Sequence, residues 1–188
     1  LSKFSEAKEM LEQSLQVLSQ DALSKYELHR VKLTLGLITL CLKDYARAER
    51  ELNEALQYFL SISSHMSLAM THFVSSLLKW EQGKREEASI HLQAGLRIAE
   101  ENGYDYFYYL GPPYLVKVCL LAIELKIEEG LNYVTRLLSG RFAPRAAEDL
   151  KKLLDHADPW VRDKAWDISK TIHRSGVSRL RIETFGEF

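Results

Sequence analysis

The sequence is poor in cysteine and carries almost no net charge. Its two cysteines, Cys41 and Cys119, each lie within an apolar run, so we interpret them as small buried hydrophobic residues, with a disulfide as the less favoured alternative. The 25 basic and 26 acidic side chains leave a formal net charge of −1, which gives no general attraction to nucleic acid or membranes. No signal peptide and no membrane-spanning run is present, so the cytoplasm is the expected compartment.

Sequence motifs of the common enzyme classes are also missing. There is no Gly-rich phosphate loop, HExxH, CxxC or GxSxG. None of the six histidines shares a helix face with another histidine or a cysteine at metal-ligand spacing. His72 lies inside an apolar helical run and is expected to be an interior or groove residue. We therefore expect no catalytic residues, no metal and no cofactor, and we predict that the protein is not an enzyme.

What the sequence does contain is an internal repeat of about 40 residues. Three stretches align on a central small residue, namely Ala7, Ala48 and Ala88, which are 41 and 40 positions apart. In each stretch a leucine follows four and eight positions later, and a small residue follows seven positions later. Offsets of four, seven and eight define one face of an α-helix. The small residues indicate places where two helices cross closely.

Each of the second and third stretches follows another apolar helix, predicted over residues 23–42 and 66–82. Twelve positions before Ala48 and Ala88 stand Gly36 and Ser76, so paired helices are expected to touch where both are thin. A weaker fourth copy is expected over residues 114–127 and 129–139, with Gly130 in the small-residue position. Helices that are apolar nearly all round are buried on more than one side. The pattern predicts an all-α fold of stacked antiparallel hairpins.

These small and leucine positions resemble the tetratricopeptide repeat. The usual period of that repeat is about 34 residues, whereas this one is 40 to 42, so each helix gains roughly one turn. The longer form resembles the helical domains of large bacterial transcriptional regulators, although the consensus Trp, Tyr and Pro positions are absent. The resemblance implies a right-handed superhelix over residues 1–140.

Beyond the repeats the sequence changes character. Asp158 and Pro159 are an N-cap followed by proline at the first helical position, and residues 141–175 resemble one HEAT-type hairpin that caps the repeats. We expect Lys151 and Lys152 to lie on a solvated face.

Residues 176–188 are predicted to be a linker and a short extended segment, since apolar and charged residues alternate in RLRIETFGEF. That string resembles the first strand of the winged-helix module in regulators of the antibiotic-regulator type, where a bacterial transcriptional activator domain follows. We therefore expect an internal part of a longer protein, which would not bind DNA specifically without the rest of that module.

Two candidate binding surfaces follow from the predicted fold. Helical repeats bind partners on the concave side, which is lined by the first helix of each hairpin. An apolar face of this kind suits an amphipathic helix, another segment of the protein or an apolar effector, although tight winding would instead bury it. The concave-face candidates are Arg30, Leu33, Leu37, Met70, Phe73, Leu77 and Trp80.

The second candidate surface is an aromatic patch before Pro112 and Pro113, comprising Tyr104, Tyr106, Tyr108 and Tyr109. Aromatic side chains at this density are enriched at interfaces. The alternative is a loop that packs into the seam between repeats.

The sequence thus predicts a non-catalytic domain that recognises a protein or an effector within a bacterial transcriptional regulator. Its partners would be other domains of the same regulator, a peptide or a small-molecule effector. One alternative is a free-standing tetratricopeptide-like scaffold that docks partner peptides without a role in transcription. The other is a helical enzyme with its site at the aromatic patch.

Overall fold

The computed structural model describes residues 2–20, 24–140 and 142–174. Within these ranges the chain forms nine α-helices and no strand, which confirms the predicted all-α class. The predicted extended segment over residues 176–188 lies outside the described residues. None of the helices in the described ranges has both the length and the hydropathy to cross a bilayer.

The chain divides into two compact units, residues 1–109 and 110–188. The first contains α1 (Ser2–Leu18), α2 (Lys25–Cys41), α3 (Tyr45–Ser61), α4 (His65–Glu81) and α5 (Arg85–Glu101). The second contains α6 (Pro112–Glu124), α7 (Leu131–Ser139), α8 (Ala143–Leu154) and α9 (Pro159–Arg174). The predicted division at residues 140 and 175 rests on repeat pattern and stays a prediction.

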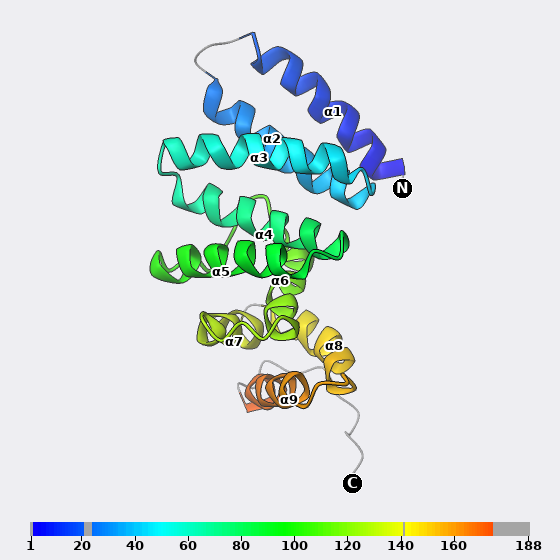
Figure 1. Ribbon diagram of the computed structural model, residues 1–188, viewed down its shortest axis with the longest axis vertical. Helices are drawn as coiled ribbons and strands as arrows, with labels where there is room; N and C mark the ends of the chain where they lie inside the picture. The colour runs from blue at the N-terminus through cyan, green and yellow to red at the C-terminus, as the bar shows by residue number, and fades with distance from the viewer. Residues whose placement is uncertain (1, 21–23, 141, 175–188) are drawn as a thin grey trace. The chain divides into compact units, whose positions relative to one another are not determined.

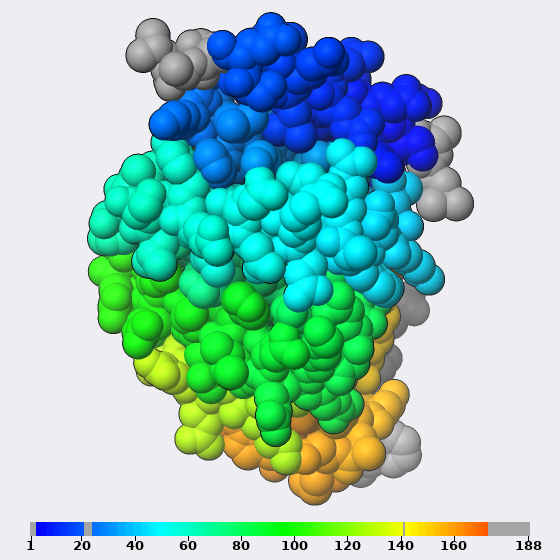
Figure 2. Space-filling view, turned by 45° about the horizontal axis from the view of Figure 1, so that its top comes forward, coloured from blue at the N-terminus to red at the C-terminus, as the bar shows by residue number. Residues whose placement is uncertain are grey.

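Helices of the first unit are regular in length and spacing. Each of α2 to α5 has 17 residues, and their first residues are Lys25, Tyr45, His65 and Arg85, so a new helix begins every 20 residues. Adjacent helices pack on one another in chain order, and Figure 1 shows α1 to α5 one beneath another. On the face shown in Figure 2, the same order appears as successive blue, cyan and green bands.

The turns between these helices repeat the same backbone geometry. Each helix ends with one residue in the left-handed conformation: Lys43 (φ 62°), Ser63 (φ 52°), Gly83 (φ 76°) and Gly103 (φ 65°). The next N–H donates to a carbonyl five residues back, as from Asp44 to Thr39 at 2.9 Å. This is the Schellman arrangement, which satisfies carbonyls that the helix end leaves free.

Small residues allow the helices to approach closely. A Cβ atom added to Gly36 of α2 would lie 2.7 Å from Cγ and Cδ2 of Leu52 in α3. A Cβ atom added to Gly95 of α5 would lie 2.8 Å from the ring of Phe73 in α4. Both distances are shorter than van der Waals contact, so neither crossing has room for a larger residue. Of the predicted small residues, Ala48, Ala55 and Ala88 are fully buried, with 0% exposure, whereas Ala7 and Ser14 of α1 are half-buried.

The second unit has shorter helices. Its α9 begins at Pro159 as predicted, where Oδ1 of Asp158 accepts from the N–H of Trp160 at 3.0 Å and Oδ2 pairs with Lys126. One prediction here is wrong: Gly130 does not lie within a helix. It precedes α7 with φ 80°, a left-handed conformation that suits glycine, and so serves as the N-cap.

Candidate recognition face

The predicted concave-face residues lie on α2 and α4, and we call them the α2–α4 row. Most of them are buried, namely Leu33, Leu37, Met70, Phe73 and Leu77. Arg30 and Trp80 are half-buried. Burial was the alternative expectation for these residues, and other parts of the first unit cover them.

The aromatic segment, residues 104–109, supplies part of that cover. Phe107 is 2% exposed and Phe73 is fully buried. Their ring centroids are 5.4 Å apart at 80°, an edge-to-face contact. Phe73 in turn packs against Gly95, where a Cβ atom would meet its ring at 2.8 Å. Because Gly95 has no side chain, the Phe73 ring can pack against α5 at this point. Phe107 packs on the same Phe73 ring.

A second contact joins the same two surfaces. The guanidinium carbon of Arg30 lies 4.5 Å from the centroid of the Tyr109 ring and 5.7 Å from that of Tyr26. At these distances a cation is attracted to the face of an aromatic ring. Arg30 also donates to the carboxylate of Glu27 at 2.5 Å, an i,i+3 pair on α2. The carboxylate and the two rings together hold the guanidinium between α2 and the aromatic segment.

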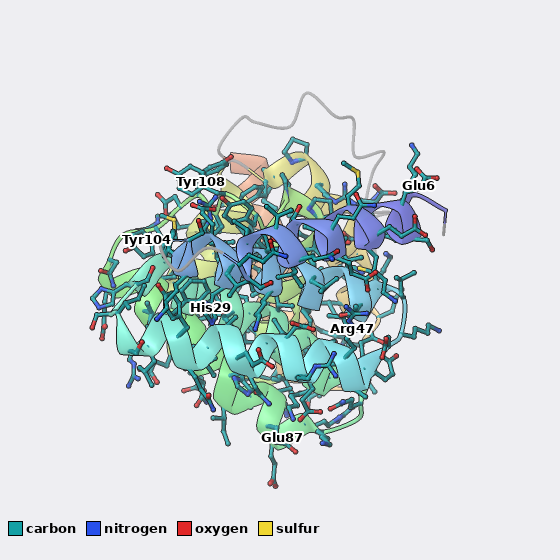
Figure 3. All side chains as sticks on the ribbon, turned by 90° about the horizontal axis from the view of Figure 1, so that it is seen from above. Glu6, His29, Arg47, Glu87, Tyr104 and Tyr108 are labelled. Atoms are coloured by element: carbon teal, nitrogen blue, oxygen red, sulfur yellow. The ribbon has the colours of Figure 1, made fainter. Side chains whose placement is uncertain are left out.

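Side chains of the aromatic segment alternate between inward and outward positions. Phe107 is buried and Tyr109 is half-buried against Arg30, whereas Tyr106 and Tyr108 are 47% and 69% exposed. The rings of Tyr106 and Tyr108 pack edge to face at 5.4 Å. Figure 3 shows Tyr104 and Tyr108 on the opposite side of the stacked helices from Glu87 of α5. The backbone that carries these rings is not helical, and it bends at residues 108–110.

The structure therefore brings the two predicted sites together through Phe107 and Tyr109. Sequence reasoning did not single out Phe107, because it selected tyrosines by the interface preference of their hydroxyls. It also missed Tyr26 and Glu27, which hold Arg30. Residues 106–109 are all aromatic in the sequence, so the alternation of buried and exposed rings is visible only in the structure. Tyr26 and Glu27 stand four and three positions before Arg30 on α2, so helical spacing was an available local signal for both.

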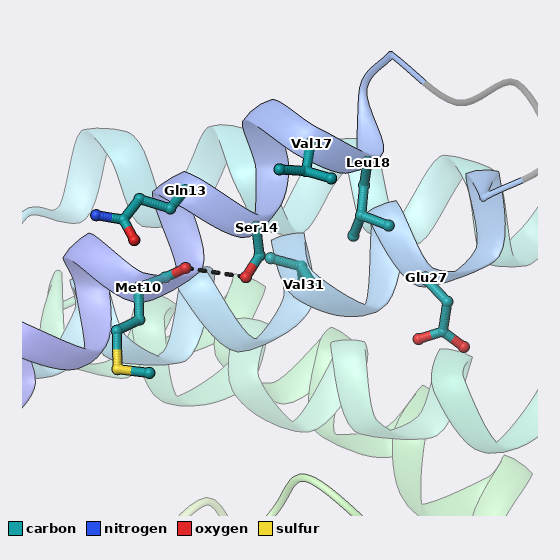
Figure 4. A pocket seen from close by; sticks show the side chains of 7 residues that line it. All are labelled: Met10, Gln13, Ser14, Val17, Leu18, Glu27 and Val31. Atoms are coloured by element: carbon teal, nitrogen blue, oxygen red, sulfur yellow. Dashed lines mark hydrogen bonds between the residues drawn. The ribbon is translucent and has the colours of Figure 1, made fainter.

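A separate groove of about 590 Å³ lies between α1 and α2 (Figure 4). Its volume falls within the range of small-ligand sites, about 300–1,000 Å³. Ser14 is already satisfied, since its hydroxyl donates to the Met10 carbonyl at 2.9 Å. The groove is open and mostly apolar, with two strongly exposed side chains, Met10 and Val17. Its lining consists of Met10, Gln13, Ser14, Val17, Leu18, Glu27 and Val31.

Two polar clusters join α4 to its neighbours. His72 Nδ1 lies 3.1 Å from His91 Nδ1 of α5, so one ring donates to the other. Burial, followed by the charges of His91 and Arg97, lowers the pKa of His72 from 6.5 to about 4. Burial also lowers the pKa of His91. Both rings are therefore uncharged at neutral pH, which suits a buried hydrogen bond.

The other cluster centres on Lys79, whose ammonium lies 2.7 Å from Glu49 of α3 and 2.6 Å from Glu87 of α5. The side-chain hydrogen bond from Lys79 lowers the pKa of each carboxyl group. This network ties three consecutive helices together, and it satisfies a lysine that is only 8% exposed. Among the described residues, no group of three or more His, Cys, Asp or Glu side chains could hold a metal ion.

Comparison of the sequence with protein families, with curated proteins and with solved structures gives no match. We therefore infer the function from the geometry of the first unit and from the sequence patterns.

Proposed function

We propose that this chain is a non-catalytic recognition domain of a bacterial transcriptional regulator, built as a right-handed superhelix of tetratricopeptide-like hairpins. The 20-residue spacing of helix starts and the thin crossings at Gly36 and Gly95 support this repeat architecture. Binding of a partner or effector would shift the arrangement of adjoining modules rather than transform a substrate.

One observation carries the recognition role: the α2–α4 row receives a segment with alternating aromatic side chains. A face that accepts one ring at Phe73 and another at Arg30 has the features of a peptide-binding surface, with an apolar seat and a polar contact beside it. The link to transcription comes from residues 179–188, whose sequence resembles the start of a winged-helix module.

The test of the transcriptional role uses the complete protein encoded by the gene. We expect it to enrich a defined DNA sequence from a randomised duplex pool, whereas residues 1–188 alone enrich none. If the complete protein enriches no sequence, the free-standing scaffold becomes the better account.

The test of the recognition role uses a reporter driven by the enriched sequence. We expect Arg30→Gln in the complete protein to alter the response of the reporter while leaving DNA affinity unchanged. The matched control is Arg50→Gln, which changes an arginine of α3 whose side chain is 62% exposed. An unchanged reporter response with Arg30→Gln, or an equal change with both variants, would show that the α2–α4 row is not the recognition surface.

A further inference from the structure

We propose that the aromatic segment is a displaceable internal ligand of the α2–α4 row. It holds the place of a non-helical partner peptide with two aromatic side chains two residues apart, and that peptide binds when the segment leaves. This inference names the partner of the proposed recognition face, and it rests on that proposed function.

The contacts of the segment define the chemistry of the partner. The first inward ring, Phe107, packs edge to face on Phe73 and is 2% exposed. The second, Tyr109, lies 4.5 Å beneath the guanidinium of Arg30. The chain between them is not helical and bends at residues 108–110, and it brings rings at positions i and i+2 to both places at once. An aromatic-x-aromatic peptide that adopts this non-helical backbone therefore reproduces both contacts, and a helix, with about 100° between neighbouring side chains, does not.

The chain around the segment allows it to leave without unfolding a helix. Residues 104–109 belong to neither α5, which ends at Glu101, nor α6, which begins at Pro112. Glycines stand on both sides: Gly103 adopts φ 65°, and Gly111 is extended with φ −60° and ψ 158°. Two of the segment's rings, Tyr106 and Tyr108, already face solvent. Release thus changes loop dihedrals and uncovers Phe73, while the hydrogen bonds within α4 and α5 stay in place.

Covalent attachment gives the segment an advantage over a free peptide. A short tether supplies an effective concentration in the millimolar range, so a peptide of equal intrinsic affinity competes poorly with it. Weakening the contacts of the segment with Phe73 and Arg30 removes that advantage and leaves the α2–α4 row available to a peptide. The segment also leads directly into residue 110, where the second unit begins.

The experiment uses a fluorescent peptide with the sequence of residues 103–111, GYDYFYYLG, and the whole chain. We expect Phe107→Ala to bind this peptide at least tenfold more tightly than the unchanged chain, as measured by fluorescence anisotropy. Tyr106→Ala, which alters an exposed ring of the same segment, should bind as weakly as the unchanged chain. A peptide with alanine in place of its phenylalanine should not bind Phe107→Ala.

Because Phe107 is buried, its replacement could also unfold the first unit, which circular dichroism would reveal. Two further measurements then decide the question. Tyr109→Ala removes only the half-buried ring at Arg30 and should strengthen peptide binding by a smaller factor. In the unchanged chain, excess peptide should accelerate amide hydrogen exchange at residues 105–109 and leave the exchange of α4 unchanged.

Peptide binding that is equal in all variants, or exchange at residues 105–109 that does not respond to peptide, would overturn the proposal. Its failure is distinct from failure of the proposed function. A complete protein that selects DNA and responds to Arg30→Gln without binding this peptide keeps its recognition role and loses only the internal ligand. Peptide competition without DNA selection would favour a scaffold that carries the same device.

Discussion

At the residue scale, the helix ends differ in the conformational energy of the residue that takes the left-handed conformation. Four turns place a residue in the left-handed region every 20 positions, and glycine occupies two of them, Gly83 and Gly103. Lys43 and Ser63 occupy the other two. A residue with a Cβ atom pays roughly 1–2 kcal/mol in that region, so these two positions retain strain that glycine would relieve.

We expect Lys43→Gly to stabilise the first unit by about 0.5–1 kcal/mol, because the relief of strain exceeds the added entropy of the unfolded chain. Thermal unfolding followed by circular dichroism measures the change. The matched control is Gln57→Gly at an exposed position within α3, which should destabilise by about 0.5–1 kcal/mol. Destabilisation by both glycines would show that Lys43 carries no such strain.

The histidine pair gives a second prediction at the same scale. The folded pKa of His72, about 4, lies below its usual 6.5, so the unfolded chain takes up this proton first as the pH falls. The contribution to stability is therefore complete above pH 6.5 and is lost as the pH falls from 6.5 to 4, by about 2–3 kcal/mol.

Chemical denaturation of the unchanged chain at a series of pH values would measure this loss. We expect His72→Gln to reduce the pH dependence of the unfolding free energy between pH 6.5 and 4. His65→Gln, a change at an exposed histidine of the same helix, should leave the dependence as it is. If the unfolding free energy of His72→Gln keeps the full pH dependence, that dependence does not come from the His72 ring.

At the scale of the helix, much of the fold could be predicted because its signals are local and periodic. Small residues at Ala48, Ala55 and Ala88 indicated the buried helix faces, and Asp158 with Pro159 indicated the start of α9. Gly130 shows the limit of this reasoning. Counting repeat positions placed it inside a helix, but its backbone takes a left-handed conformation just before α7, and composition alone did not distinguish the two uses.

The crossing of α2 and α3 gives the prediction at this scale. Gly36→Ala should destabilise the first unit by about 1–3 kcal/mol, because its Cβ atom would overlap the Leu52 side chain, 2.7 Å away. In a Leu52→Ala background the obstruction is gone. The same change should then be neutral or stabilising by up to about 1 kcal/mol, since alanine is the better helix former.

Urea unfolding of the four variants in this cycle measures the coupling between the two positions. An equal cost for Gly36→Ala in both backgrounds would mean that the helices do not approach closely at this point.

At the scale of the first unit as a whole, two surfaces that were predicted separately from the sequence are in contact in the structure. The α2–α4 row and the aromatic segment were two separate candidates, and the contact between Phe73 and Phe107 connects residues 34 positions apart. Such a contact has no periodic signal, because it depends on how α4, α5 and the following loop fold back on one another. The individual helices could be predicted from their periodic patterns, whereas the contact between the aromatic segment and the α2–α4 row could not.

A double-mutant cycle on Phe73 and Phe107 tests the central claim, that the aromatic segment is held by the α2–α4 row. Unfolding free energies of Phe73→Leu, Phe107→Leu and the double variant should give a coupling of about 0.5–1.5 kcal/mol, the usual worth of an edge-to-face pair. As a control, Phe107→Leu is combined with Phe59→Leu, because Phe59 has ring contacts with Tyr26, His29 and Tyr58. We expect the control effects to add; a Phe73–Phe107 coupling of zero would contradict the account.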